Sequence, residues 1–247
     1  MKRDMKQDPP TTQTITNVGL RKATALSVDW LGDSIYWINE QANRYARIEQ
    51  IGIKGNSRRT VIWGDQLNEP YELKVDPIAG FIFWTDWKKR ISPDDDRIRI
   101  ISRATMAGDQ ITPLASNRFN TVGDRIKHIT LDYRNKGKPR FFGFSATVSF
   151  NPNRAQMIYY VDYDKENIQA ISYYQKLVDK PKVISQATGN GVPRIPAFYD
   201  KILYWTSHLE RSKSSKWTIE GINTTSHEKL KSIPLSGVDD IGDMMLK

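Results

Sequence analysis

The sequence predicts an all-β fold made of repeats, of the β-propeller type. A short aromatic signal recurs four times, at residues 35–39, 83–86, 158–162 and 203–207. A second signal precedes the first two copies at a constant spacing, because Asp29 lies eight positions before Trp37 and Asp76 eight before Trp84. Self-similarity with a period of about 40–50 residues is typical of repeat architectures rather than of a single motif.

Each repeat is expected to hold four short strands joined by turns, which is one blade of a propeller. In the first repeat we expect strands at 25–30, 34–39, 46–53 and 58–63, and in the second at 72–76, 81–85, 97–105 and 110–114. In the third we expect them at 127–133, 157–162, 168–174 and 182–185, and in the fourth at 197–199, 202–206, 217–222 and 229–233. Turn sequences separate the strands, such as Leu31-Gly32-Asp33 and Lys54-Gly55-Asn56-Ser57. No helical periodicity of comparable length is present.

Composition sets further bounds on the chain. Residues 1–15 are polar and rich in Pro and Thr, so we expect a disordered lead-in before a propeller spanning 16–247. The beginning of the chain has no apolar core of a secretory signal, and no stretch approaches the roughly 20 apolar residues of a membrane span. The 247 residues carry a net charge of +9 and no Cys. The charge has two interpretations, a solvated surface or attraction to acidic partners such as anionic glycans.

An insertion interrupts the third repeat at residues 134–156. Such a segment forms a loop or an extra hairpin on one face of a blade, where loops often serve function. A faulty gene model would produce the same insertion, and both interpretations stay open.

Several motifs resemble one known family, the YWTD repeats (LDL-receptor class B). The first repeat carries Val28-Asp29, Tyr36-Trp37, Arg47-Ile48-Glu49 and Lys54-Gly55-Asn56-Ser57-Arg58. The others carry Val75-Asp76-Pro77, Phe83-Trp84-Thr85-Asp86, Ala104-Thr105-Met106-Ala107-Gly108, Leu131-Asp132, Tyr204-Trp205-Thr206 and a closing Val238-Asp239-Asp240-Ile241. Together they resemble propellers of the LDL receptor-related proteins.

This resemblance implies a six-bladed propeller, of which the chain holds about four to five blades. The motif order resembles repeats two through five and the start of the sixth, so the first blade is expected to be absent. We therefore expect a fragment or an incomplete gene model of a larger receptor.

The motif residues are expected to be structural. The aromatic residues Trp37, Trp84, Tyr160 and Trp205 would pack between neighbouring blades, because aromatic side chains bury large areas. The motif acids Asp86 and Asp162 would accept hydrogen bonds from backbone amides across a turn.

Ligand binding is expected on one face of the disk, around the central channel. The resemblance implies that residues just before each innermost strand line this channel mouth. Carried onto this chain, those positions are Thr24, Tyr71, Lys127 and Arg194. The alternative is that they are ordinary loop residues at a blade edge. His128 lies beside Lys127, and histidine changes charge near endosomal pH, so it is a candidate for acid-triggered ligand release.

Catalysis, metal and cofactor binding have no sequence support. The three His are scattered without metal-ligand spacing, and there is no phosphate-binding loop, nucleophile elbow or nucleic-acid motif. Asn223-Thr224-Thr225 is an N-glycosylation sequon, which places a candidate glycan on Asn223.

The resemblance implies a non-catalytic, extracellular ligand-binding domain of a single-pass plasma-membrane receptor, either endocytic or a signalling co-receptor. The partners it implies are a secreted protein or peptide, an adjacent EGF-like module and a propeller-folding chaperone. The first alternative is the propeller of a receptor tyrosine kinase or matrix protein. A propeller hydrolase or lactonase is the least favoured.

Overall fold

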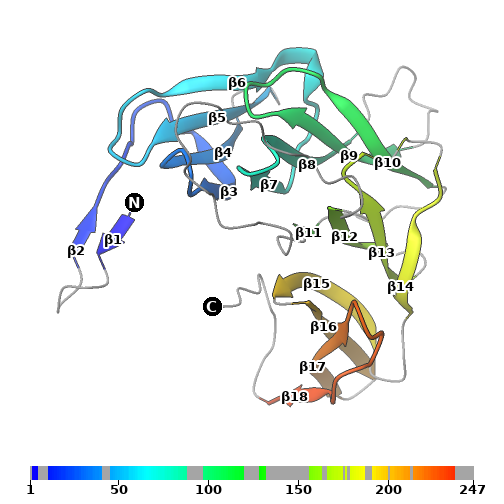
Figure 1. Ribbon diagram of the computed structural model, residues 1–247. Coiled ribbons are helices and arrows are strands. Elements are labelled where there is room, and N and C mark those ends of the chain that lie inside the picture. Colours follow the sequence, from blue (N-terminus) through cyan, green and yellow to red (C-terminus); the bar gives the residue numbers. More distant parts are fainter. Residues whose placement is uncertain are drawn as a thin grey trace, which may run out of the picture.

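Four β-sheets form an arc in a computed structural model of the chain (Figure 1). The structure describes residues 2–4, 11–40, 45–87, 97–119, 128–131, 156–162, 166–174, 176, 179–186, 191–199, 201–211 and 214–236. Within these residues each of the four sheets has four antiparallel strands in chain order, as expected for propeller blades. The innermost strands of neighbouring sheets contact one another around the centre of the arc.

The first two blades follow the sequence prediction, except that the outermost strand of the second was expected at 110–114 and lies at Thr112–Phe119. The first is formed by β3 (Lys22–Asp29), β4 (Ser34–Glu40), β5 (Ala46–Gly52) and β6 (Arg59–Trp63). The second is formed by β7 (Leu73–Asp76), β8 (Phe81–Trp87), β9 (Arg97–Thr105) and β10 (Thr112–Phe119). A short 3-10 helix, Gly64–Gln66, leads from one blade to the next.

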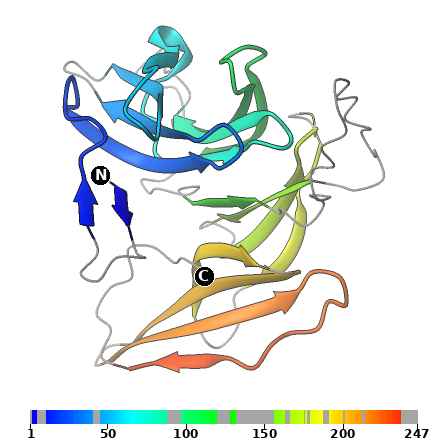
Figure 2. The same cartoon turned by 60° about the vertical axis from the view of Figure 1, so that its left-hand side comes forward.

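The third and fourth blades complete the arc, and the fourth lies opposite the first (Figure 2). The third consists of β11 (Ile129–Leu131), β12 (Met157–Asp162), β13 (Asn167–Ser172) and β14 (Lys182–Gln186). The fourth consists of β15 (Val192–Tyr199), β16 (Ile202–Arg211), β17 (Ser214–Asn223) and β18 (Ile233–Leu235).

The innermost strand of the fourth blade was expected at 197–199 and is longer, Val192–Tyr199, and the outermost strand begins later than predicted. We expected the outermost strand of the fourth blade at 229–233, but it pairs only from Ile233 onward, through Thr218 with Pro234 and Trp217 with Leu235. Residue Lys229 makes a single bridge to Ile222, because the chain first turns through His227, whose φ is 61°. Pro234 is tolerated here because β18 is an edge strand.

The expected lead-in contains a small two-stranded pair. Strand β1 (Lys2–Asp4) runs antiparallel to β2 (Thr11–Gln13), and the pair lies at the open side of the arc. The insertion at 134–156 lies outside the described residues except for Gln156.

The aromatic motif builds the core because its adjacent residues face opposite sides of a blade. In the second blade Trp84 packs with Ile38 and Ile62 of the first blade, whereas Phe83 packs with Tyr160 and other residues of the third. The third and fourth blades repeat this arrangement, since Tyr159 and Trp205 belong to the hydrophobic cluster between them. The second strand of each blade is therefore the element that joins the blades.

Candidate functional site

Two faces of the disk differ in how their turns are stabilised. On one face the innermost strand of a blade turns into the next strand, and an Asp holds that turn. Asp29 Oδ1 accepts from the amides of Leu31 and Gly32, at 3.1 and 2.8 Å. Asp76 Oδ1 accepts in the same way from Ile78 and Ala79. The Val-Asp motif therefore marks a turn, and its carboxylates accept hydrogen bonds from backbone amides.

The motif acid Asp86 stabilises turns on the opposite face. Its carboxylate accepts from the amides of Asn68 and Glu69, at 3.0 and 2.7 Å, and from its own neighbour Trp87 at 2.7 Å. The residue is 2% exposed. Burial raises its pKa to about 6, although these amides and the charge of Arg99 act to lower it. A buried carboxylate with this many amide donors is a structural group.

The corresponding residues in the other blades keep the position but change the partners. Asn39 accepts from the Arg21 amide and donates to the Gly19 carbonyl and to Glu49. Asp162 accepts from Gln169, whose own oxygen accepts from Tyr160 at 2.6 Å. In the fourth blade Ser207 is buried at this position, two residues after the buried Trp205.

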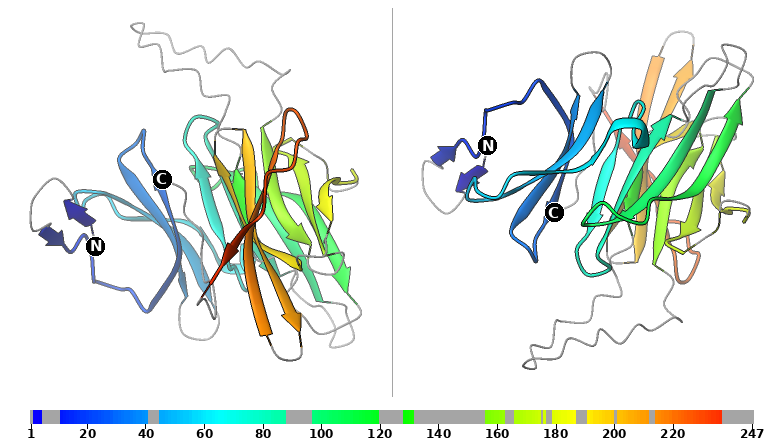
Figure 3. Two further views of the ribbon diagram at one scale, coloured as in Figure 1. Left: turned by 90° about the horizontal axis from the view of Figure 1, so that it is seen from below. Right: turned by 90° about the horizontal axis from the view of Figure 1, so that it is seen from above.

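The channel-mouth residues lie at the beginnings of the innermost strands. Thr24 and Arg194 both lie where the pairing register shifts, in β3 between Thr24 and Ser27 and in β15 between Pro193 and Pro196. Such bulges point side chains away from the regular strand directions and are common next to active sites. Lys127 lies outside the described residues. The edge-on views show that strand ends gather on two opposite faces (Figure 3).

Charged and aromatic residues surround Tyr71. We call this group the mouth cluster, and its members are Tyr71, Glu72, Lys74, Arg99 and His128. The ring of Tyr71 is 44% exposed and meets the His128 ring edge-on, with centroids 5.7 Å apart. The buried guanidinium of Arg99 lies 5.7 Å from the centre of the same ring. It lies 4.3 Å from the ring of Trp87, which suits a cation–π contact.

Glu72 links the charges of this cluster. Its carboxylate lies 2.7 Å from Lys74 Nζ and 3.1 Å from His128 Nδ1, so it joins the second blade to the third. Burial acts to raise the pKa of Glu72, but the hydrogen bond to His128 and the charge of Lys74 outweigh it and hold the pKa below its usual value. The site thus presents an exposed aromatic ring beside a fixed carboxylate.

The sequence prediction named Tyr71 and His128 as candidates but not Glu72 or Arg99, which contact them in the structure. Their roles depend on contacts between elements far apart in the sequence, such as Glu72 and His128, which are 56 positions apart. Glu72 and His128 occupy equivalent places in their repeats, because Glu72 lies four positions before Asp76 and His128 four positions before Asp132. This shared spacing is the sequence signal that could have identified Glu72.

Two tryptophans at strand ends and the glycosylation sequon lie outside the mouth cluster. Trp63 is 60% exposed, whereas Trp87 is buried, with the guanidinium of Arg99 over its ring. Asn223 ends β17, and its side-chain oxygen accepts from the amides of Thr225 and Ser226. The sequon therefore lies in a turn, and its Thr225 is exposed.

Two features are absent from the described residues. No helix among them is long and apolar enough to cross a membrane. Likewise, no group of three or more His, Cys, Asp or Glu in that part of the chain is placed to hold a metal ion.

Comparison with known sequences gives a similarity over part of the chain. No protein-family model matches the chain. An 83-residue segment, 34% of the chain, is 35% identical to low-density lipoprotein receptor-related protein 5 of Mus musculus. The match spans only 5% of that relative's length.

Comparison with solved structures shows the fold. TolB from Acinetobacter baumannii is similar over 95% of this chain and 51% of its own, with a TM-score of 0.55 and 12% identity. A puromycin hydrolase is similar over 92% of this chain and 31% of its own, with a TM-score of 0.54 and 10% identity. The all-β propeller fold is confirmed. The described residues form four blades of a β-propeller, and an 83-residue segment of the chain is similar in sequence to a low-density lipoprotein receptor-related protein.

Proposed function

We propose that this chain is a non-catalytic, extracellular ligand-binding propeller of a receptor related to the LDL receptor-related proteins. The observation that carries the proposal is the mouth cluster on a YWTD-type propeller. Tyr71 offers an exposed aromatic ring at the channel mouth, and the buried Arg99 and the partly buried His128 pack against it. Rigid aromatic anchors surrounded by polar groups are typical hot spots of protein recognition.

The ligand in this proposal is a secreted protein or peptide that covers the mouth. Glu72 would select ligands with a basic or hydrogen-bond-donating group near the aromatic contact, because its carboxylate stays ionised. Anionic glycans, an EGF-like module and a propeller-folding chaperone are further partners we propose. A glycan on Asn223 would lie at the end of β17, at a turn of the fourth blade.

The turn carboxylates support a binding role over a hydrolytic one. Asp29, Asp76 and Asp86 each accept from two or more backbone amides, so they are committed to holding turns. A propeller hydrolase would need carboxylates free to act on a substrate or a metal.

His128 would make binding sensitive to acid in this proposal. It contacts both the anchor Tyr71 and the carboxylate of Glu72, so protonation changes the charge beside the ligand. Binding of a ligand to the His128→Ala variant should then differ less between about pH 7.4 and about pH 5.5 than binding to the parent chain.

The test is selection of random peptides displayed on phage against the immobilised chain, followed by hydrogen–deuterium exchange with the selected peptide. We expect slower exchange at the amides around Tyr71 and His128 when the peptide is bound. Protection confined to the opposite face, around the Asp29 and Asp76 turns, would refute the proposed site.

A further inference from the structure

We propose that the face opposite the mouth cluster carries a second binding site, which takes an acidic peptide through one of its side-chain carboxylates. The site lies between the second and third blades and is built on Arg103 of β9. Its guanidinium carbon lies 4.5 Å from the centre of the Phe81 ring and 5.4 Å from that of the Tyr174 ring. Tyr71 precedes β7, whereas this site adjoins the turn that follows β7, so the two lie on opposite faces.

Strand pairing places Arg103 close to the Asp76 turn. Arg103 lies two residues before the end of β9, whose last residue pairs with Phe81 at the start of β8. Tyr173, which directly follows β13 of the third blade, donates to the Asp76 carboxylate at 3.0 Å. Tyr174 is the next residue, so Phe81, Arg103 and Tyr174 meet where the two blades adjoin this face.

The position of Arg103 holds an uncharged residue in the other three described blades. In each blade this position lies opposite the first aromatic residue of the motif pair, which is Phe83 in the second blade. The residues found there in the first, third and fourth blades are Gln50, Ala170 and Gly221. The blade architecture therefore does not require an arginine at this position.

One edge of the Arg103 guanidinium is open to a ligand. Its Nη1 donates to the Tyr173 carbonyl at 2.7 Å, which fixes the group against the third blade. Nε is buried without a hydrogen-bond partner in the described residues, so a ligand does not reach it. Nη2 keeps accessible surface and has no partner in that part of the chain. The ion pairs within the same residues likewise do not involve Arg103.

The surroundings of this guanidinium favour an anion that carries apolar groups beside it. Burial lowers the pKa of Arg103, which means that its charge is poorly hydrated, and an anion on Nη2 offsets that loss. A guanidinium donates strong, charge-assisted hydrogen bonds to carboxylates. Tyr174 is 44% exposed, so its ring offers an apolar contact next to the bound carboxylate.

The segment after Tyr174 adds attraction for an acidic chain. Lys176, Lys180 and Lys182 are exposed on it, and Asp179 is the one acid among its described residues. The Asp179 carboxylate accepts from the Lys176 amide at 2.9 Å, so it is engaged by the backbone. Lysines alone would suit a sulfated glycan, but an arginine edge between aromatic rings suits a peptide, which combines carboxylates with apolar side chains.

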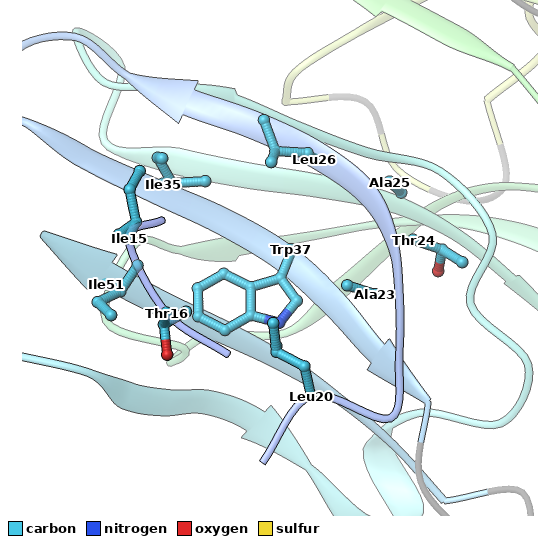
Figure 4. A pocket seen from close by; sticks show the side chains of 10 residues that line it. All are labelled: Ile15, Thr16, Leu20, Ala23, Thr24, Ala25, Leu26, Ile35, Trp37 and Ile51. Atoms are coloured by element: carbon cyan, nitrogen blue, oxygen red, sulfur yellow. The ribbon is translucent and has the colours of Figure 1, made fainter. Parts of the chain in front are cut away.

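The pocket beside Trp37 in the first blade differs from this site (Figure 4). Its volume is about 210 Å³, and aliphatic side chains such as Ile15, Leu20 and Ile51 surround the indole. Among the described residues no charged side chain lines it, and Trp37 Nε1 is buried. The pocket therefore offers no charge that would select a ligand, whereas the Arg103 site does.

The test compares two peptides by two-dimensional NMR of the 247-residue chain. The probe is acetyl-Glu-Leu-Glu-Leu-Glu-amide, and the matched peptide has Gln in place of every Glu. The shift of the Lys176 amide signal during titration gives each dissociation constant. We expect a saturable shift with the acidic peptide and at least about tenfold weaker binding of its Gln counterpart.

Arg103→Gln is the decisive variant, because Gln50 shows that glutamine fits this position. It should bind the acidic peptide at least about tenfold more weakly than the parent chain. Lys54→Gln, which removes an equal charge from an exposed turn of the first blade, should change the affinity by less than about twofold. Tyr174→Ala removes only the half-exposed ring and should weaken binding about threefold.

Four results would each overturn the proposal. They are unchanged affinity in Arg103→Gln or in Tyr174→Ala, equal weakening by Lys54→Gln and Arg103→Gln, equal affinity for the two peptides, and binding of a heparin hexasaccharide without binding of the acidic peptide.

Discussion

The Nδ1 atom of His128 lies 3.1 Å from Oε2 of Glu72. Each residue directly precedes the innermost strand of its blade, so this one contact joins the second and third blades at the channel mouth. Tyr71 lies beside it, with its ring against His128. The exposed anchor of the proposed binding face therefore depends on how two blades meet.

This contact predicts a measurable coupling between the two side chains. We expect the double-mutant cycle of Glu72→Gln and His128→Ala to give about 1 kcal/mol of coupling. Burial acts to raise the pKa of Glu72, but its hydrogen bond to His128 and the charge of Lys74 hold the pKa below its usual value, so the carboxylate is ionised at neutral pH. Urea unfolding of the parent chain, the two single variants and the double variant measures the cycle, and a coupling of zero would contradict the contact.

A second contact between blades involves a buried phenol. Tyr173 donates to Asp76 at 3.0 Å, and both residues are fully buried. The Tyr173→Phe variant should lose about 1.5–3 kcal/mol of unfolding free energy, since the bond is to a carboxylate. Tyr174→Phe is the matched control, because its hydroxyl bonds Gln156 at an exposed site, and it should change stability by about 0.5 kcal/mol or less. Chemical denaturation compares the two; equal losses would argue against a role for the Asp76 bond.

Asp86 should give the propeller a distinctive pH dependence. Its pKa rises from 3.8 to about 6 on folding, so between these values the folded chain binds the proton more tightly than the unfolded chain. Its contribution to unfolding free energy is therefore largest below about pH 4 and falls by on the order of 3 kcal/mol as pH rises through 6. We predict that Asp86→Asn lacks this fall, and Asn39 shows that asparagine fits the position.

Urea unfolding of Asp86→Asn at a series of pH values tests this slope. The Asp109→Asn variant is the control, because Asp109 is exposed, and it should keep the slope of the parent chain. If the parent and Asp86→Asn curves run parallel between pH 4 and 6.5, Asp86 does not titrate as described.

Trp84 and Trp63 should differ sharply in their contribution to stability. Trp84 is 1% exposed between two blades, whereas Trp63 is 60% exposed at the end of β6. Trp84→Ala should cost about 3–5 kcal/mol, and Trp63→Ala about 0.5 kcal/mol or less. Thermal unfolding of both variants gives the comparison, and similar melting temperatures would mean that the motif does not join the blades.

The repeat pattern predicted most strands because it depends on local signals. The aromatic pair at Tyr36-Trp37 has a buried strand pattern, and Asp29 fixes the turn before it, so β3 and β4 could be located from the sequence. The outermost strands were harder to predict from the sequence. Strand β18 has one partner and a mostly exposed pattern, and its Pro234 and the preceding turn obscured its start.

The site could be predicted only in part. Tyr71 was found by its place in the repeat, and the structure surrounds it with charged residues. Thr24 occupies the same place in the first blade but lines the pocket beside Trp37, because a different element covers that blade. Arg99 comes from the third strand of its blade, and no spacing along the chain links it to Tyr71.

The most direct test of the proposed binding face is the dissociation constant of a selected peptide for two Tyr variants, measured by calorimetry. Tyr71→Ala removes the anchor at the mouth, and Tyr199→Ala removes a ring of similar exposure, 54% against 44%, from the opposite end of an innermost strand. We predict that Tyr71→Ala weakens binding at least tenfold, as expected for a hot spot, while Tyr199→Ala leaves it unchanged. Equal affinity of Tyr71→Ala and the parent chain would contradict a ligand-binding face at the mouth cluster.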